Sequence, residues 1–409
     1  MTAPKPYPKR VLFVGPGRFA PGVWDTRARY IISDLLAPLH KRAEIHFLTQ
    51  DPPEHALGGF EHLEKEFGIV HHTPRSLALA SLPAFLGTGS SWLASAWSKG
   101  LAKLKVRDDF DQWLIWTRQA AQKIKPDVIT HAHGLLLFGK VATQVAQERG
   151  IRSVVRVPGD EVDARLHMQV YAQGSKAHQK DLDAQDKALA MADAIVAMSE
   201  REKQRLRALG HDRNKIFVCP RGVDTRLFEQ KPQRAPQASS KLKFLFLGRQ
   251  SREKGYDLIE AAAKGFAAKR NDIEFIFAGS FEPGSEGNRH YLGFVNANEL
   301  PALLKSVDAF ILPSRTEGFP QALAEAMASG LPCIASRHLF ETQFADGKDL
   351  LLTDLTTASL SQAIEALADE PNLRKSLGDQ ARLNAVQQLD MSLFQARYAS
   401  LLLGSPLQP

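Results

Sequence analysis

Two glutamates, Glu317 and Glu325, stand eight positions apart in the segment PSRTEGFPQALAEAMASGLPCIAS, which covers residues 313–336. The Gly-Phe-Pro turn after Glu317 opens into an Ala- and Leu-rich helix that is predicted to start near Phe319, so Glu325 is expected on its second turn. Ionised carboxylates accept hydrogen bonds from neighbouring hydroxyls, and the free N–H groups at a helix start favour an anion. The pattern predicts a ligand with hydroxyls beside an anionic group, such as a nucleotide sugar. The alternative is a capped surface helix with two solvated glutamates.

Two cations precede this segment in a setting that also suits an anion. The strand predicted over Lys243–Leu247 ends just before Arg249. Lys254 stands ahead of a helix that is predicted to begin at Tyr256. Cations at these positions would offset the charge of a bound diphosphate, and more strongly that of a departing one. Taken alone, two basic residues in a loop are also typical of a solvated turn.

These loops belong to a chain that alternates short β-rich runs with amphipathic helical patterns. Such alternation indicates parallel sheets covered by helices. The strands predicted in the first half are Arg10–Val14, Glu44–Leu48, Asp127–His131, Ser153–Val157, Ala194–Ala197 and Ile216–Val218. Those predicted in the second half are Lys243–Leu247, Glu274–Ala278, Ala309–Leu312 and Cys333–Ala335. Helices are predicted at Trp24–His40, Ser199–Ala208 and Met391–Leu403, among others.

A polar, proline-containing stretch without periodicity, QKPQRAPQASSK, separates the two halves and is predicted to be a linker. Two α/β units joined in this way should leave a cleft between the carboxyl ends of their strands, where such folds bind ligands. The last helix is expected to return toward the first domain. The predicted boundaries are an N-terminal acceptor-binding domain at 1–228, a linker at 229–242, a C-terminal donor domain at 243–390, and a returning helix and tail at 391–409.

Composition excludes several classes of protein. The 409 residues suffice for two domains, and 44% apolar with 24% charged residues is typical of a globular protein in water. Cys219 and Cys333 stand far apart in apolar runs, which favours two buried thiols over a disulfide or metal site and indicates a reducing, cytoplasmic location. No apolar stretch of signal-peptide or membrane-spanning length is found.

The net charge of +7 is uneven, because residues 1–240 carry the positive excess and the remainder is slightly acidic. The basic residues are scattered and no nucleic-acid-binding module is recognisable, so we expect no nucleic-acid partner. Residues 76–107 join apolar and aromatic residues to basic ones, as an interfacial membrane helix does. This segment predicts peripheral contact with an anionic membrane, at the inner face. The alternative is a helix that packs on the first domain with a solvated basic edge.

The second half resembles a known enzyme family. GRQSREKG, IEFIFAG, GFVNANELPALLKSVDAFILPSRTEGFPQALAEAMASGLPCIAS and FETQFADGKDLLL follow one another in an order and spacing similar to retaining glycosyltransferases of family 4. The first half is similar more loosely, through Gly15–Gly17, HAHG at 131–134 and the stretch 192–224. The resemblance implies the GT-B fold, an α/β architecture of two Rossmann-like, doubly wound parallel-sheet domains that face a cleft.

The resemblance also implies roles for individual residues. Arg249 and Lys254 would bind the donor diphosphate. Glu325 would hold the ribose hydroxyls of the nucleotide, and Glu317 would contact hydroxyls of the donor sugar. Five further positions would line the donor: Gly15 and Gly17 from the first domain, the backbone at Val295 beside the base, and the loop residues Gly318 and Phe319.

The implied catalytic set adds His133, which would face the donor sugar near the reacting carbon, to Glu317, Arg249 and Lys254. A single histidine at a strand end is also typical of a structural hydrogen bond. Asp181 and Asp183 form a DLD sequence, but it stands in an amphipathic stretch, so we expect solvated helix charges there rather than a metal site. No cofactor and no required metal are expected, because cations and helix dipoles would offset the phosphate charge.

Some positions depart from the family pattern. RHLFE follows Ser336, where a glycine pair is common, and Asp349 replaces a common glycine. The loop GPGRFAPG lacks the acidic residue that usually follows a glycine pair. These departures concern the acceptor side, whereas the donor-side positions match.

The predicted function is therefore transfer of a sugar, with retention, from a UDP- or GDP-sugar to a glycan or lipid-linked acceptor in envelope polysaccharide or glycoconjugate biosynthesis. Two alternatives stay open: another GT-B enzyme, such as a nucleotide-sugar epimerase or a phosphorylase, and a non-catalytic protein that binds nucleotide sugars or membranes. A dinucleotide oxidoreductase is disfavoured, because no G-x-G-x-x-G opens a helix after the first strand.

Overall fold

The computed structural model describes residues 9–15, 35–49, 60–74, 77, 109–132, 134–159, 161–167, 169–228 and 241–404. The chain divides into two compact units. Unit 1 comprises the chain up to Ala197, Leu206–Cys219 and the chain from Gln395, and unit 2 comprises Met198–Arg205 and Pro220–Phe394.

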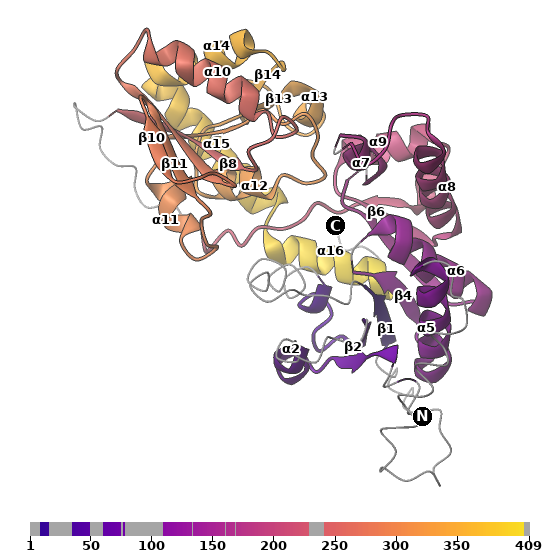
Figure 1. Cartoon of the computed structure of the whole chain (residues 1–409). Coiled ribbons are helices and arrows are strands. Elements are labelled where there is room, and N and C mark those ends of the chain that lie inside the picture. Colours follow the sequence, from indigo (N-terminus) through magenta and orange to yellow (C-terminus); the bar gives the residue numbers. More distant parts are fainter. Residues whose placement is uncertain are drawn as a thin grey trace. The chain divides into compact units, whose positions relative to one another are not determined.

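Unit 1 is built on a sheet whose seven described strands are all parallel, in the order β3-β2-β1-β4-β5-β6-β7. The strands are β1 (Lys9–Val14), β2 (Ala43–Leu48), β3 (Val70–His72), β4 (Val128–His131), β5 (Arg152–Val157), β6 (Ala194–Ala197) and β7 (Ile216–Val218). Its described α-helices are α2 (Phe60–Phe67), α5 (Asp109–Ile124), α6 (Lys140–Arg149), α7 (Glu161–His167) and α8 (Lys176–Met191), whereas α9 (Glu200–Ala208) lies mostly in the part of the chain that groups with unit 2. Figure 1 shows α5, α6 and α8 side by side as one layer over this sheet.

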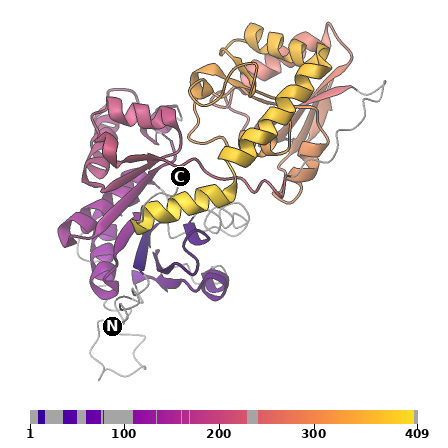
Figure 2. The same ribbon diagram turned by 180° about the vertical axis from the view of Figure 1, so that it is seen from behind.

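Unit 2 repeats the same plan with the order β10-β11-β9-β8-β12-β13-β14, in which only the edge pair β10–β11 is antiparallel. The strands are β8 (Leu242–Gly248), β9 (Ile273–Gly279), β10 (Gly284–Glu286), β11 (Arg289–Gly293), β12 (Ala309–Leu312), β13 (Cys333–Ser336) and β14 (Leu351–Thr353). The helices are α10 (Tyr256–Ala267), α11 (Leu300–Lys305), α12 (Gln321–Ala328), α13 (Arg337–Phe340), α14 (Thr357–Asp369) and α15 (Pro371–Gln388). Figure 2 shows α15 lying across one face of the sheet, where it packs on α12.

The sheet of unit 2 is buried on both faces, and its strands show the alternation that this requires. Phe310 and Leu312 of β12 belong to the core beneath α12 and α15, whereas Ala309 and Ile311 belong to the core beneath α10 and α14. Successive side chains of a strand point to opposite faces, so a strand covered on both sides is apolar throughout. This is why the continuous apolar runs in the sequence become central parallel strands.

The predicted architecture of two parallel-sheet, Rossmann-like domains is confirmed. The ten predicted strands form within one residue of their predicted ends. Sequence analysis missed the short strands β3, β10, β11 and β14, which have three to five residues each and therefore carry little periodicity. Of the helix predicted over Trp24–His40, the structure describes only residues 35–40, which form a short helical turn.

The boundary between the units differs from the predicted one. Residues 220–228 group with unit 2 rather than with the first domain. The cause is a backbone pairing, in which Val223 donates to Leu389 O at 2.8 Å and accepts from Met391 N at 2.9 Å. The predicted linker falls almost wholly outside the described residues.

The last helix, α16 (Met391–Leu403), begins in unit 2 and packs from Gln395 onward within unit 1. Arg152 donates to Leu401 O at 3.1 Å, and the guanidinium of Arg156 lies 5.0 Å from the centre of the Tyr398 ring. The C-terminal helix is thus part of the core of the first domain.

Gly255 is a position where only glycine fits. Its φ is +72°, and a Cβ there would lie 2.1 Å from the carbonyl oxygen of Pro313. We expect Gly255→Ala to lower the free energy of unfolding of unit 2 by about 2–4 kcal/mol, because left-handed strain adds to a clash with backbone. Gly265→Ala, within α10 and with open space around its Cβ, should instead raise stability by about 0.5–1 kcal/mol.

The two units can be followed separately in urea. All five tryptophans precede residue 117 and belong to unit 1, so tryptophan fluorescence reports unit 1 and circular dichroism reports both units. Gly255→Ala should move the circular-dichroism transition and leave the fluorescence transition in place. Equal stability of the two variants would contradict the packing described for Gly255.

Candidate functional site

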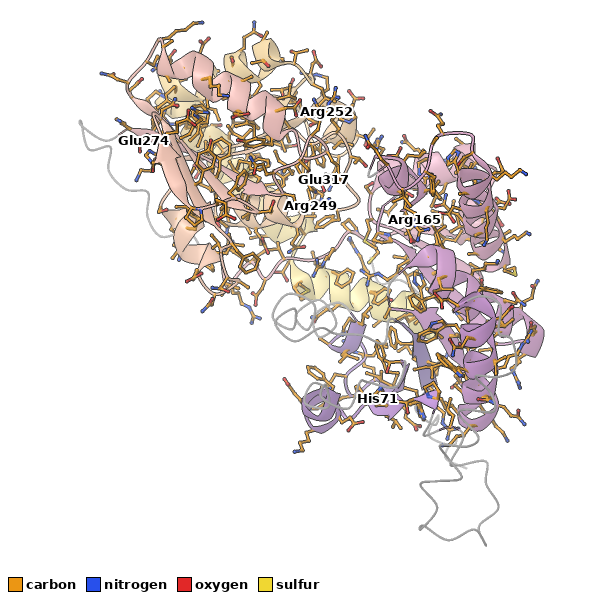
Figure 3. The ribbon with its side chains drawn as sticks, viewed as in Figure 1. His71, Arg165, Arg249, Arg252, Glu274 and Glu317 are labelled. Atoms are coloured by element: carbon orange, nitrogen blue, oxygen red, sulfur yellow. The ribbon has the colours of Figure 1, made fainter. Side chains whose placement is uncertain are left out.

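Neighbouring parallel strands of unit 2 bring the predicted charged residues to one edge of the sheet. β8 lies between β9 and β12, and all three run in the same direction. The loops that follow β8 and β12 therefore start side by side at the carboxyl edge, where open α/β sheets bind ligands. Figure 3 shows Arg249, Arg252 and Glu317 together at this end of unit 2, whereas Glu274, near the start of β9, lies apart from them.

The central contact of this site is an ion pair between Lys254 and Glu317. Lys254 Nζ donates to Glu317 Oε1 at 2.7 Å, and Ser314 Oγ donates to the same oxygen at 2.7 Å. The two charged side chains are only 20% and 8% exposed. A pair this sheltered from water is costly to break unless another partner replaces the lost charge. Separating the pair would require another anion or acceptor for Lys254 and another hydrogen-bond donor for Glu317.

The second cation, Arg249, is more accessible. Its side chain is 56% exposed and donates to Glu253 Oε2 at 2.7 Å, four residues further along the same loop. An exposed pair of this kind contributes little to stability because solvent screens it. The guanidinium can therefore turn toward an anion at low cost.

Arg315 links the loop that contains Glu317 to the loop that contains Lys254. The sequence did not predict this role. Its backbone N donates to Glu253 O at 2.8 Å, and its guanidinium donates to both carboxylate oxygens of Asp257 at 2.7 and 2.8 Å and to the carbonyl of Arg252. Its own carbonyl accepts a hydrogen bond from His338 Nε2 at 2.9 Å. Planar guanidinium groups suit such two-oxygen contacts, so this link has a defined geometry. Arg315 is two residues before Glu317, so its contacts restrict the position of the backbone that carries the Glu317 carboxylate.

Glu325 lies on the second turn of α12, as the spacing predicts, and Glu317 stays on the preceding loop. The residue is buried, with 6% of its surface exposed. Its Oε1 accepts a hydrogen bond from Gln321 Nε2 at 3.3 Å, and the same amide nitrogen lies 3.5 Å from the carbonyl oxygen of Gly222. The sequence analysis did not predict the contact of Gln321 with Glu325, although residues one helical turn apart are neighbours on a helix surface.

The other positions of unit 2 that the sequence predicts to line a donor follow β11 or precede α12. Val295 follows β11 and Phe319 precedes α12, and both pack partly buried against the unit 2 core. Gly318, between Glu317 and Phe319, is partly exposed. Phe294, next to Val295, presents 71% of its surface to solvent. The side chains of Val295 and Phe319 thus attach these two segments to the core of unit 2.

The predicted positions in unit 1 are only partly described. Gly15 follows β1, its N donates to Leu48 O at 3.2 Å, and a Cβ there would lie 2.6 Å from that of Ala132. The backbone at Gly15 therefore lies closer to the end of β4 than a residue with a Cβ atom at this position would allow. Gly17 and His133 lie outside the described residues, so their predicted roles stay predictions.

The structure places the DLD sequence on a helix, as predicted. Asp181 accepts from Arg165 at 2.7 Å and Asp183 from Gln179 at 2.9 Å, all within unit 1. Among the residues that the structure describes, no group of three His, Cys, Asp or Glu side chains gathers as a metal would require. Cys219 and Cys333 are buried thiols, and burial raises the pKa of Cys333.

The predicted membrane-contact segment, 76–107, lies outside the described residues except for Leu77. Across the described parts of the chain, no helix combines the length and the apolar character needed to cross a bilayer.

Comparison with known proteins gives two adjoining family matches. Residues 228–384 match the family Glycosyl transferases group 1, and residues 97–227 match Glycosyltransferase Family 4. Together they cover more than two thirds of the chain.

Curated relatives are similar over part of their length. The putative colanic acid biosynthesis glycosyltransferase WcaL of Escherichia coli is 28% identical over 43% of this chain and 48% of its own. The D-inositol 3-phosphate glycosyltransferase of an Arthrobacter species is 30% identical over 42% and 47%, respectively. The putative teichuronic acid biosynthesis glycosyltransferase TuaC of Bacillus subtilis is 24% identical over 62% and 64%. The chain thus matches about half the length of the first two relatives.

Solved structures share the fold of the whole chain. HepE of Anabaena, crystallised with UDP and glucose, superposes with a TM-score of 0.66 over 97% of this chain and all of that one, at 17% identity. The lipopolysaccharide outer core galactosyltransferase WaaB in its apo form gives 0.64 over 97% and 99%, at 16% identity. On the two family matches and this shared architecture, the chain belongs to the group 1 glycosyltransferases of family 4, with the GT-B fold.

Proposed function

We propose that the protein transfers a sugar from a nucleotide-sugar donor to an acceptor, with retention of configuration at the reacting carbon. The observation that carries the proposal is the Lys254–Glu317 pair, held at the carboxyl edge of the sheet with Arg249 and Glu325 on the adjoining segments. A donor offers a diphosphate for the two cations and two sets of hydroxyls for the two carboxylates.

In the proposed mechanism, the donor replaces the ion pair. The diphosphate binds the ammonium group of Lys254 and the guanidinium group of Arg249. Glu317, no longer paired with Lys254, then accepts hydrogen bonds from the sugar hydroxyls. As the bond between the sugar and the diphosphate breaks, negative charge grows on the phosphate oxygens and the two cations interact with it more strongly. This difference between ground state and transition state is what lowers the barrier.

Retention and independence from metal ions are parts of the proposal. The acceptor hydroxyl would attack on the face from which the diphosphate departs, because the described residues at this edge offer cations and hydrogen bonds rather than an evident nucleophile. Lys254 and Arg249 would supply the positive charge that a metal ion supplies elsewhere.

The acceptor is proposed to be a glycan or a lipid-linked saccharide of the cell envelope, met at the cytoplasmic face of the membrane. Support comes from relatives whose names refer to colanic acid and teichuronic acid biosynthesis. The structural neighbour HepE was solved with UDP-glucose, so uridine nucleotides are the first donors to test.

The decisive experiment has two steps. A panel of UDP- and GDP-sugars is screened for thermal stabilisation, since a bound donor raises the melting temperature by mass action. The stabilising donor is then incubated with saccharide acceptors in EDTA, and free nucleotide and the anomeric configuration of the product are read by NMR. Nucleotide release that requires an acceptor, with the donor configuration kept, is the expected result. Isomerised donor without an acceptor would indicate an epimerase, phosphate-dependent release would indicate a phosphorylase, and binding without turnover would indicate a non-catalytic protein.

Removal of the Glu325 carboxylate should weaken donor binding. We expect Glu325→Ala to cost about 1–3 kcal/mol of donor affinity, the scale of hydrogen bonds to a charged group. Calorimetric titration of wild type and variant with the donor measures this loss. Glu365→Ala, which removes an exposed carboxylate from α14 of the same unit, should leave the affinity unchanged. Equal affinity of Glu325→Ala and wild type would exclude Glu325 from the nucleotide site.

The link between Arg315 and Asp257 should set the efficiency of the site without touching the donor. Arg315→Asp should lower kcat/KM by about 10–100-fold, because a small displacement of Lys254 or Glu317 disturbs the reacting geometry. The exchange Asp257→Arg/Arg315→Asp restores an ion pair with inverted polarity and should recover part of this loss. Donor-saturation kinetics of the single and exchanged variants measure the effect.

A matched ion pair serves as the control for this exchange. Arg270 donates two hydrogen bonds to Asp272, just before β9, at the opposite edge of the same sheet. Arg270→Asp should therefore leave kcat/KM unchanged. If it lowered kcat/KM as much as Arg315→Asp does, the effect would be one of general stability and the positioning role of Arg315 would be wrong.

A further inference from the structure

Glu161 in unit 1 accepts hydrogen bonds from the backbone turn that follows His133 in the sequence. Its Oε2 atom accepts from Leu135 N at 2.9 Å and from Leu136 N at 3.3 Å. These two residues start η2 (Leu135–Gly139), a π-helical turn that continues into α6. His133, two residues before η2, is the residue for which the sequence predicts a position near the reacting carbon. Glu161 therefore contacts the chain next to a predicted catalytic residue.

The order of the strands explains why Glu161 reaches this turn. β4 and β5 are adjacent and parallel, so the segments that follow them start side by side at the carboxyl edge of the sheet. η2 comes after β4, and Glu161 comes after β5, at the start of α7. Before His133, His131 Nε2 accepts a hydrogen bond from Arg156 N of β5 at 3.0 Å. Described residues on both sides of His133 are thus bound to β5 or to the segment that follows it.

The first N–H groups of η2 require an acceptor from elsewhere in the protein. N–H groups at the start of a helix have no partner within it, and Leu135 and Leu136 are buried. The carboxylate of Glu161 also brings a negative charge to the positive end of the helix dipole. Single π-helical turns are rare and are frequently found at functional sites. The Glu161 contact therefore restricts the backbone at a turn of unusual shape.

An ion pair holds the other oxygen of Glu161. Arg165, one turn later on α7, donates to Glu161 Oε1 at 3.2 Å and to Asp181 Oδ2 of α8 at 2.7 Å. Both oxygens of Glu161 accept hydrogen bonds from the protein, which disfavours a role as nucleophile or base. Asp181 is the first acid of the DLD sequence, and its contact with Arg165 restricts the group that orients Glu161.

We propose that Glu161 is a positioning residue for sugar transfer, which holds the turn after His133 in the geometry that the reaction requires. Arg165 and Asp181 orient its carboxylate. This inference deepens the proposed function and rests on it. A displacement of about 1 Å can lower a reaction rate by about 100-fold. The proposed nucleotide contacts lie in unit 2, so the loss of Glu161 should affect kcat rather than donor binding.

The split between kcat and KM separates this role from one in folding alone. Glu161→Ala should lower kcat by about 10–100-fold, with the KM for the donor within about twofold of wild type. Glu161→Gln should recover most of the loss, because its amide oxygen can still accept from the N–H groups of Leu135 and Leu136. Steady-state kinetics at saturating acceptor, below the melting temperature of each variant, measure both constants.

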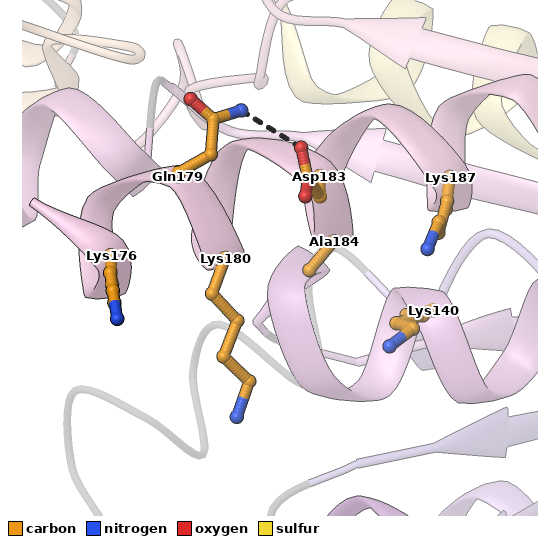
Figure 4. A pocket seen from close by; sticks show the side chains of 7 residues that line it. All are labelled: Lys140, Lys176, Gln179, Lys180, Asp183, Ala184 and Lys187. Carbon is orange, nitrogen blue, oxygen red and sulfur yellow. Dashed lines mark hydrogen bonds between the residues drawn. The ribbon is translucent and has the colours of Figure 1, made fainter. Parts of the chain in front are cut away.

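The two acids of the DLD sequence form a matched pair of variants. Asp181→Asn should lower kcat by about threefold, the scale of a partly exposed ion pair. It should have no further effect in the Glu161→Ala background, because Asp181 acts through Arg165 on that carboxylate. Asp183 is exposed and accepts from Gln179 Nε2 of its own helix at 2.9 Å, as Figure 4 shows. Asp183→Asn should therefore leave kcat unchanged, and a loss equal to that of Asp181→Asn would contradict the role of Asp181.

Amide hydrogen exchange tests the contact without any substrate. Mass spectrometry of peptides that cover Leu135–Gly139 should show exchange at least about tenfold faster in Glu161→Ala than in wild type, since two buried N–H groups lose their charged acceptor. Exchange in the strands of unit 2 should stay unchanged, which checks that the variant is folded. Asp183→Asn should leave the exchange of both regions unchanged.

The combined results decide the proposal. Faster exchange in η2 together with a lower kcat at an unchanged KM supports it. Unchanged exchange in η2, or faster exchange with an unchanged kcat, would overturn it. If the intact protein transfers no sugar, the proposed function fails and the positioning role fails with it, whereas the exchange result still decides whether Glu161 holds the turn.

Discussion

The contact on which the site depends is the 2.7 Å bond between Lys254 and Glu317. It joins two loops that are 63 residues apart in sequence, and its two charges are largely shielded from water. Sheltered charges are tolerated only when their geometry is well determined, because each would otherwise have a desolvation cost without compensation. Much of the surrounding structure of unit 2 can be understood as a means of meeting this constraint.

Three features of unit 2 supply that geometry. The pairing of β8 with β12 starts the two loops side by side. At Gly255 the backbone passes so close to Pro313 that a side chain is excluded, and Arg315 joins the loops through backbone and side chain together. Helices pack against both apolar faces of β12, and this packing stabilises the strand end from which the Glu317 loop starts. Strand pairing, the close backbone approach and the Arg315 contacts thus all restrict the positions of the loops that carry Lys254 and Glu317.

The two cations of the site are each paired with a carboxylate of the protein. Arg249 is matched by Glu253 and Lys254 by Glu317, so each cation has a carboxylate partner within the protein. A ligand that carries both an anion and hydroxyls can replace these partners together, whereas an anion alone would leave Glu317 buried without its cation. Selectivity for such a ligand over simple anions would follow from this coupling, since burial of an unpaired charge is costly.

The sequence by itself determined the class of fold, the ten main strands and the placement of Glu325 on a helix and Glu317 on a loop. Apolar periodicity, turn residues and helix starts are local signals, and they act over the few residues that a pattern can reveal. The short strands β3, β10, β11 and β14 and the division at residue 220 depend on pairing partners elsewhere in the chain. Only the tertiary structure decided that Lys254 meets Glu317 and that Arg315 joins their loops. These contacts connect residues that are distant in sequence, and the physical reason is that the order of parallel strands, rather than any local pattern, decides which loops become neighbours.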